Sequence, residues 1–176
     1  MRTVLGCWLA VLALAAPAER PRLVRESLAA LERIFDSRIE RQNIEDPFLL
    51  LGTTRGVYLE GYGAVLTAEL NLVSGPAVTP FRPALTKEEI ARLHARKLQR
   101  LPLLRRMMRE MLVDAASSLE AVPPNEQVVL AVSLFYYSWE DRTGLPGQIL
   151  MQAQRQQLLA LRQPGGTESV IVVKEY

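Results

Sequence analysis

The sequence predicts an α+β or mixed α/β fold with a sheet of about four strands, in the order α-β-β-α-β-α-β. Two observations carry this prediction. The segment 128–137 is β-branched and aromatic, lacks Gly and Pro, and is apolar at odd and even positions, which is typical of a central strand covered on both faces. The segments 21–42 and 87–121 repeat apolar residues at the three-four spacing of amphipathic helices.

The first eighteen residues differ from the rest of the chain. One positive charge precedes an uncharged apolar run over 4–16, and 16–18 (Ala-Pro-Ala) offers small residues ahead of a cut before Glu19. This is the pattern of a secretory signal peptide. A membrane-spanning helix needs roughly 20 apolar residues, so a retained anchor is the weaker alternative. We expect an exported protein, periplasmic or extracellular, with 19–176 as one α+β domain.

Composition excludes several classes of protein. The only cysteine, Cys7, lies in the apolar run, so the cleaved chain has no thiol for a disulfide or a zinc site. Without Arg2, twenty of the 21 basic residues remain against 19 acidic ones, whereas a nucleic-acid-binding protein usually shows a clear basic excess. His94 is the only histidine. We therefore expect no metal site, no cofactor and no nucleic-acid partner.

The first helix is predicted over about 21–42. Its apolar positions recur at steps of four, three, four and four, which places them on one face. Asp46 stands before Pro47 and so leaves the helical region, which ends the element. We expect this helix to cover a sheet through Val24, Leu28, Leu31, Phe35 and Ile39, with Leu23, Ala30 and Ile34 widening the stripe.

Two strands are predicted next, over 55–60 and 64–73. The second alternates between apolar and polar residues, which indicates one buried and one solvated face. Gly61 and Gly63 allow positive φ between the strands, so we predict a hairpin. One long strand with a glycine bulge is the alternative. The residues expected to face the core are Ala64, Leu66, Ala68, Leu70 and Leu72.

A long helix is predicted over 87–121, packed on the sheet. Thr86 and Glu89 have the spacing of a capping box. An interior proline removes a hydrogen bond and costs about 3 kcal/mol, so Pro102 predicts a kink or a break near Leu101.

The same helix carries a basic stripe. Arg92, Arg96 and Arg100 are spaced by four and so share one face. This stripe is a candidate patch for an anionic partner, in particular anionic membrane lipid. The alternative is a solvated face whose arginine stems cover apolar surface.

A βαβ unit is predicted at the C-terminal end, with a helix over 146–161 and a closing strand over 169–173. Such units pair in parallel with a right-handed crossover, and ligands tend to lie beyond the carboxyl ends of parallel strands. The stretch 139–142 follows the central strand at that position. Trp139 and Arg142 are therefore candidate ligand-binding residues, and Glu140 and Asp141 are candidate acid–base groups.

Glu60 and Glu69 flank the predicted hairpin and are two further candidate carboxylates. Since the sequence carries no catalytic motif, our first hypothesis is a non-catalytic binding or interaction domain of the bacterial cell envelope, whose partner is an envelope protein or polymer. One alternative is a carboxylate-based hydrolase that acts on an envelope polymer or sugar. The other is peripheral association with anionic lipid through the basic helix; integral membrane association is not expected after cleavage.

Overall fold

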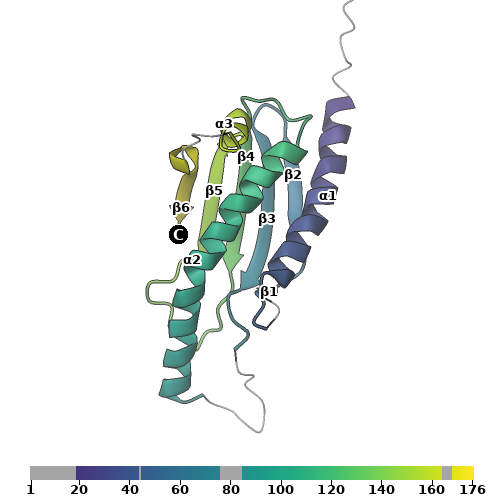
Figure 1. The fold of residues 1–176 in the computed structure, drawn as a ribbon. Helices are drawn as coiled ribbons and strands as arrows, with labels where there is room; N and C mark the ends of the chain where they lie inside the picture. Colours follow the sequence, from purple (N-terminus) through teal and green to yellow (C-terminus); the bar gives the residue numbers. More distant parts are fainter. Residues whose placement is uncertain (1–18, 44, 76–84, 164–167) are drawn as a thin grey trace, which may run out of the picture.

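The computed structural model describes residues 19–43, 45–75, 85–163 and 168–176, so the predicted signal peptide lies outside the described residues. A mixed sheet of six strands is covered on one face by two long helices (Figure 1), which confirms the α+β class. The elements in chain order are α1 (Glu19–Arg41), β1 (Leu49–Leu50), β2 (Arg55–Leu59), β3 (Gly63–Asn71), α2 (Lys87–Ser118), β4 (Gln127–Leu134), β5 (Gln148–Gln154), α3 (Arg155–Ala160), the 3₁₀ turn η1 (Glu168–Val170) and β6 (Val172–Glu175).

The strand order places β4 inside the sheet. Both β1 and β2 pair antiparallel with β3, which pairs in parallel with β4. On its other side β4 pairs antiparallel with β5, and β5 with β6. A parallel pair cannot be joined by a tight turn, and α2 makes the crossover from β3 to β4 (Figure 1).

The central strand is buried on its two faces for different reasons. Val128, Leu130, Val132 and Leu134 belong to the core beneath the helices. On the opposite face, Val129 is 3% exposed although no helix lies over it in the described part of the chain. The expectation that other elements cover this strand on both faces is therefore wrong, and Val129 is flanked instead by the side chains of β3 and β5.

Helix α1 packs against the sheet as its pattern predicts. All five residues of the predicted apolar stripe are at most 1% exposed. The residues expected to widen the stripe differ, since Leu23 and Ile34 are 46% and 55% exposed. Helix α1 therefore buries a narrow stripe and leaves two large apolar side chains on its outer surface.

The predicted hairpin is confirmed, with β2 and β3 joined at Gly61–Gly63. The amide of Tyr62 donates to the carbonyl of Leu59 at 3.0 Å. Gly61 and Gly63 have φ of +80° and +137°, which L residues rarely adopt. A Cβ on Gly63 would also overlap the backbone carbonyl of Gln127 in the neighbouring parallel strand.

Helix α2 begins at the predicted capping box. The amide of Thr86 donates to Glu89 Oε2 at 3.0 Å, and the amide of Glu89 donates to Thr86 Oγ1 at 3.2 Å. The helix continues through Pro102 without a break and ends at Ser118. It changes direction partway along its length (Figure 1), as a proline kink predicts.

The predicted helix over 146–161 is wrong in its first half, whereas its second half contains α3. Its first half is strand β5, in which Ile149, Met151 and Ala153 are buried and the residues between them are partly exposed. Apolar residues four apart satisfy a helical period and a period of two alike, and pairing with β4 decides between them. Because β5 lies between β4 and β6 and is antiparallel to both, the predicted parallel βαβ unit is also wrong.

We predict that Gly63→Ala lowers the free energy of unfolding by about 3 kcal/mol or more, because the backbone is strained and the added methyl group overlaps Gln127. The matched control is Gly61→Ala, which has a positive φ but open space around it and should lose about 1 kcal/mol. Urea denaturation of both variants measures the difference. Equal losses would show that the close approach to β4 does not limit this position.

Candidate functional site

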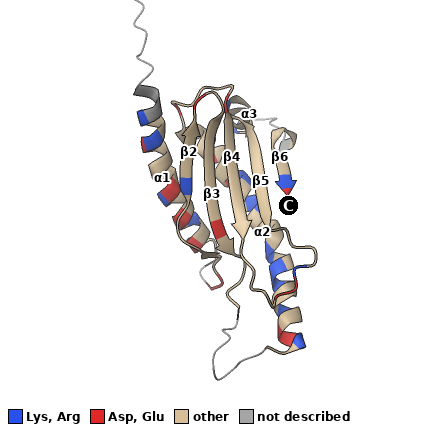
Figure 2. Ribbon diagram, turned by 180° about the vertical axis from the view of Figure 1, so that it is seen from behind, with Lys and Arg blue, Asp and Glu red and all other residues tan. Residues whose placement is uncertain are grey.

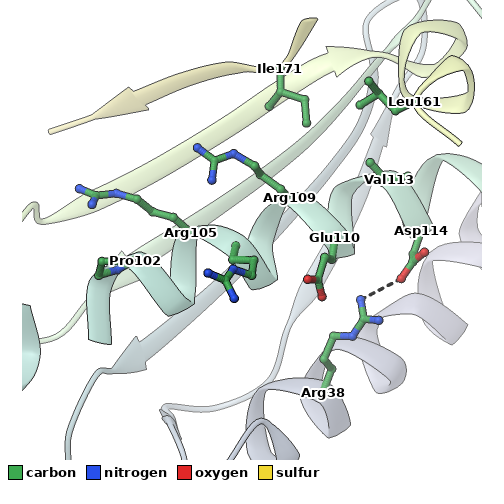
Figure 3. A pocket seen from close by; sticks show the side chains of 10 residues that line it. Arg38, Pro102, Arg105, Arg109, Glu110, Val113, Asp114, Leu161 and Ile171 are labelled. Atoms are coloured by element: carbon green, nitrogen blue, oxygen red, sulfur yellow. Dashed lines mark hydrogen bonds and ion pairs between the residues drawn. The ribbon is translucent and has the colours of Figure 1, made fainter. Parts of the chain in front are cut away.

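A groove of about 800 Å³ runs along α2, between α1 and the C-terminal segment (Figure 3). Helix α2 supplies most of its lining, because residues three and four apart lie on one helical stripe. Arg105 and Arg109 lie on the side of the C-terminal segment that carries Ile171, while Glu110 and Asp114 lie on the side of α1. The groove thus has a basic wall and a wall of mixed charge.

The basic wall is held by a bidentate ion pair. Arg105 Nε and Nη2 donate to the two carboxylate oxygens of Glu175 at 2.6 and 2.7 Å. The hydrogen bonds from Arg105 hold the pKa of Glu175 below its ordinary value, and the same bonds raise the pKa of Arg105. Such fork-to-fork pairs fix geometry as well as charge, so this one fastens the last strand to α2.

The opposite wall is held by one carboxylate with two partners. Asp114 Oδ2 accepts from Arg38 Nη1 at 2.8 Å (Figure 3), and its Oδ1 accepts from Arg162 Nη2 at 3.0 Å. These side chains are 35 to 54% exposed, so each pair contributes at most about 1 kcal/mol. Asp114 therefore mainly positions two guanidinium groups beside the groove.

The groove keeps an excess of positive charge after these pairs are counted. Four arginines and two acidic residues line it, and Glu175 and Arg162 add one charge of each sign. Arg106 is exposed and forms no ion pair with any residue that the structure describes. The remaining lining is apolar and consists of Pro102, Val113, Leu161 and Ile171.

The predicted basic stripe is largely paired within the protein. Arg96 and Arg100 both bind Asp46, at 2.9 and 2.8 Å, and Arg100 also donates to the carbonyl of Asp46 at 2.6 Å. Arg100 lies 4.5 Å from the ring centre of Phe48. These contacts fasten the segment after α1 to α2. Arg92 remains exposed and forms no ion pair within the described residues.

Glu140 is part of a buried ion pair. Its Oε2 binds Lys97 Nζ, and the two side chains are 3% and 0% exposed. Burial lowers the pKa of Lys97, while Glu140 opposes the shift. The ammonium group also lies 4.7 Å from the ring centre of Tyr136, whose hydroxyl donates to Pro146 at 2.8 Å. These contacts clamp the loop between β4 and β5 onto α2.

The other candidates from this loop do not converge on one cleft. Asp141 is exposed and accepts from the amide of Thr143 at 2.9 Å, which lowers the pKa of Asp141. Arg142 lies over the ring of Tyr136, and Trp139 stacks on Tyr137 with ring centres 5.3 Å apart. The loop is thus an aromatic and ionic cluster whose contacts are internal or with α2.

Glu60 and Glu69 lie far apart. Glu60 is in the turn before β3, and Glu69 is the seventh residue of β3, on the face without helices. At about 3.3 Å per strand residue they are roughly 20 Å apart, whereas the two carboxyl groups of a glycosidase lie about 5 to 10 Å apart. Neither residue lines the groove.

Sequence reasoning missed the groove, although part of its signal was visible. Arg105, Arg106 and Arg109 continue the basic helix, but the partners across the groove are distant in the chain. Arg38 and Asp114 are 76 positions apart, and Arg105 and Glu175 are 70 apart. Spacing along one helix cannot reveal such neighbours.

Comparison with known proteins returns no family model, no curated protein and no solved structure that matches this chain. Among the described residues, no group of three His, Cys, Asp or Glu side chains is placed to hold a metal ion. No helix in the described ranges is long and apolar enough to cross a membrane. The geometry of the groove is therefore the main guide to function.

We predict that Glu175→Gln makes the free energy of unfolding less dependent on pH in the acid range. The folded-state pKa of Glu175 lies below its ordinary 4.5, so its contribution is complete above pH 4.5 and is lost as the pH falls through the folded-state value. Between pH 7 and pH 3 the free energy of unfolding should therefore fall by about 1 kcal/mol more in the wild type than in the variant.

Urea denaturation across that pH range is the measurement. Glu120→Gln removes an equal charge at an exposed residue that has no ion pair in the described chain, and its pH dependence should match the wild type. An unchanged pH dependence in Glu175→Gln would contradict the prediction.

Proposed function

We propose that this protein is a non-catalytic interaction domain that works in the cell envelope after export, and that its groove along α2 binds an acidic segment of a partner protein. One observation carries the proposal: arginines from two helices converge on a single groove of about 800 Å³ whose remaining lining is partly apolar. Guanidinium groups bind carboxylates through two parallel hydrogen bonds, and Arg105 already binds Glu175 in this way.

The mixed lining favours a protein segment over a dense polyanion. Glu110 and Asp114 stand beside the arginines and would repel closely spaced phosphates. Val113, Leu161 and Ile171 offer contact for apolar side chains. A segment that alternates carboxylates with apolar residues matches both features.

The geometry gives the hydrolase alternative little support. Glu140 is buried in its ion pair with Lys97, and Glu60 and Glu69 are roughly 20 Å apart by strand geometry. A hydrolase needs two carboxylates that face one substrate. The two carboxylates that line the groove are Glu110 and Asp114, and both lie among arginines. This arrangement favours binding of a ligand over catalysis.

The lipid alternative is also less favoured. Two of the three arginines of the predicted stripe are paired with Asp46, so Arg92 is left to meet a membrane surface. Each basic residue near an anionic surface contributes about 1 kcal/mol, and one such residue is a weak anchor.

Export is supported by the pattern of residues 1–18, with one positive charge, an apolar run and small residues before Glu19. An envelope location agrees with a cleaved chain that contains no cysteine, because such a chain is unaffected by an oxidising compartment.

We predict that Arg106→Glu weakens binding of a fluorescein-labelled peptide of alternating glutamate and leucine by about tenfold, since charge reversal removes a charged hydrogen bond and adds repulsion. Fluorescence anisotropy measures the affinity, which should also fall as salt is added. Arg106 is exposed, so the variant should fold normally.

The matched control is Arg92→Glu, which makes the same charge change on the same helix outside the groove. It should alter the affinity less than twofold. If both variants weaken binding equally, the peptide responds to overall charge and the groove is not its site.

Export has its own test. We predict that the full chain, expressed in a bacterium with a C-terminal tag, is recovered from the envelope or the medium with a mass that begins at Glu19. Ala18→Arg should block cleavage, because signal peptidases need a small residue there, while Ala13→Val should have no effect. Recovery of the uncut wild-type chain from the cytoplasm would contradict the proposal.

A further inference from the structure

We propose that the face of the sheet opposite α1 and α2 binds a second copy of this chain, so that the protein is a two-fold dimer. This face is defined here as the open face. It is uncovered by any helix in the described part of the chain (Figure 2). The proposal is independent of the function proposed for the groove, which lies on the other side of the sheet.

The open face is apolar along a row that crosses the sheet. The pairing registers place one residue of each strand side by side, from β2 to β6. Four of these five residues are valines, and they lie at both edges and in the centre of the sheet. The row consists of Val57, Val65, Val129, Gln152 and Val172.

The two ends of this row are half-exposed, whereas Val129 at its centre is 3% exposed. Val57 and Val172 are 50% and 46% exposed, and Leu59, on the same face of β2, is 47% exposed. Val57 and Leu59 lie two residues apart on β2 and form an exposed apolar patch at that edge of the face, and exposed apolar patches mark interaction sites in folded proteins. Isolated exposed apolar residues would need no such explanation.

The centre of the open face carries no charge. Strands β4 and β5 contain no Lys, Arg, Asp or Glu (Figure 2). The charges of this face are confined to the other strands, as Arg55, Glu69 and Lys174. Burial of the centre therefore desolvates no ion, which is the main electrostatic penalty of forming an interface.

The polar groups of the face are complementary to themselves. Beside the valine row lie amide side chains, which carry a donor and an acceptor each. A two-fold axis sets one patch against an identical patch, so amides of one copy can bond amides of the other. The amides are Gln127, Gln148, Gln152 and Gln154.

The area suffices for a dimer. Five strands at a spacing of about 4.8 Å and about seven residues of 3.3 Å each give a face of roughly 550 Å². Two such faces bury roughly 1,100 Å², which exceeds the approximately 1,000 Å² that a specific interface requires.

Helix α1 protects the sheet at its edge and leaves this face bare. The amide of Gly56 in β2 donates to Glu32 at 2.8 Å, and its carbonyl accepts from Arg25 at 2.9 Å. The edge strand is thus occupied by α1. A second copy is accordingly expected to stack on the face, as in a β-sandwich.

The test is the mass of the full chain in solution, by light scattering after size exclusion, at about 50 μM, a concentration at which even an interface with a micromolar Kd is largely occupied. The wild type should have the mass of two chains. Val57→Lys and Gln152→Lys each place a charge in the valine row and should reduce the mass to one chain.

The matched control is Ile34→Lys, because Ile34 is 55% exposed on α1 and lies off the open face; it should remain a dimer. Circular dichroism should show that all three variants are folded, and an unfolded Val57→Lys would leave Gln152→Lys to decide. A wild-type mass of one chain overturns the proposal. So does association that survives both sheet variants, or that Ile34→Lys abolishes, because another surface would then drive it.

Discussion

The parallel pairing of β3 with β4 is the constraint on which the remaining structure depends. Gly63 begins the pair beside Gln127, where only a residue without a side chain fits. Parallel strands need a crossover, and α2 supplies it over the helical face of the sheet (Figure 1). Once α2 lies there, one of its faces completes the core and another faces α1 and the C-terminal segment, which creates the groove.

Ion pairs with acidic residues decide which arginines of α2 are bound within the protein and which remain exposed. Asp46 binds Arg96 and Arg100, and Glu175 binds Arg105. Arg106 lines the groove, is exposed and forms no ion pair with any described residue. The helix is therefore basic along much of its length, but the positions available to a partner are set by carboxylates from elsewhere in the chain.

The sequence predicts those features that depend on neighbours along the chain. The stripe of α1, the capping box of α2 and the hairpin at Gly61–Gly63 all follow from local spacing and are confirmed. Strand β5 was missed because Ile149 and Ala153 fit a helix as well as a strand, and the pairing with β4 that decides is non-local. The groove was missed for the same reason, since Arg38 and Asp114 meet only in the folded protein.

The hydrogen bonds between α1 and the backbone of Gly56 affect how β2 can pair while the chain is still folding. Arg25 and Glu32 occupy the outward backbone groups of β2 only when the helix is docked. Before docking, that strand offers a free amide and carbonyl to any extended segment that it meets. Docking of α1 thus withdraws one donor and one acceptor of β2 from pairing with another extended chain.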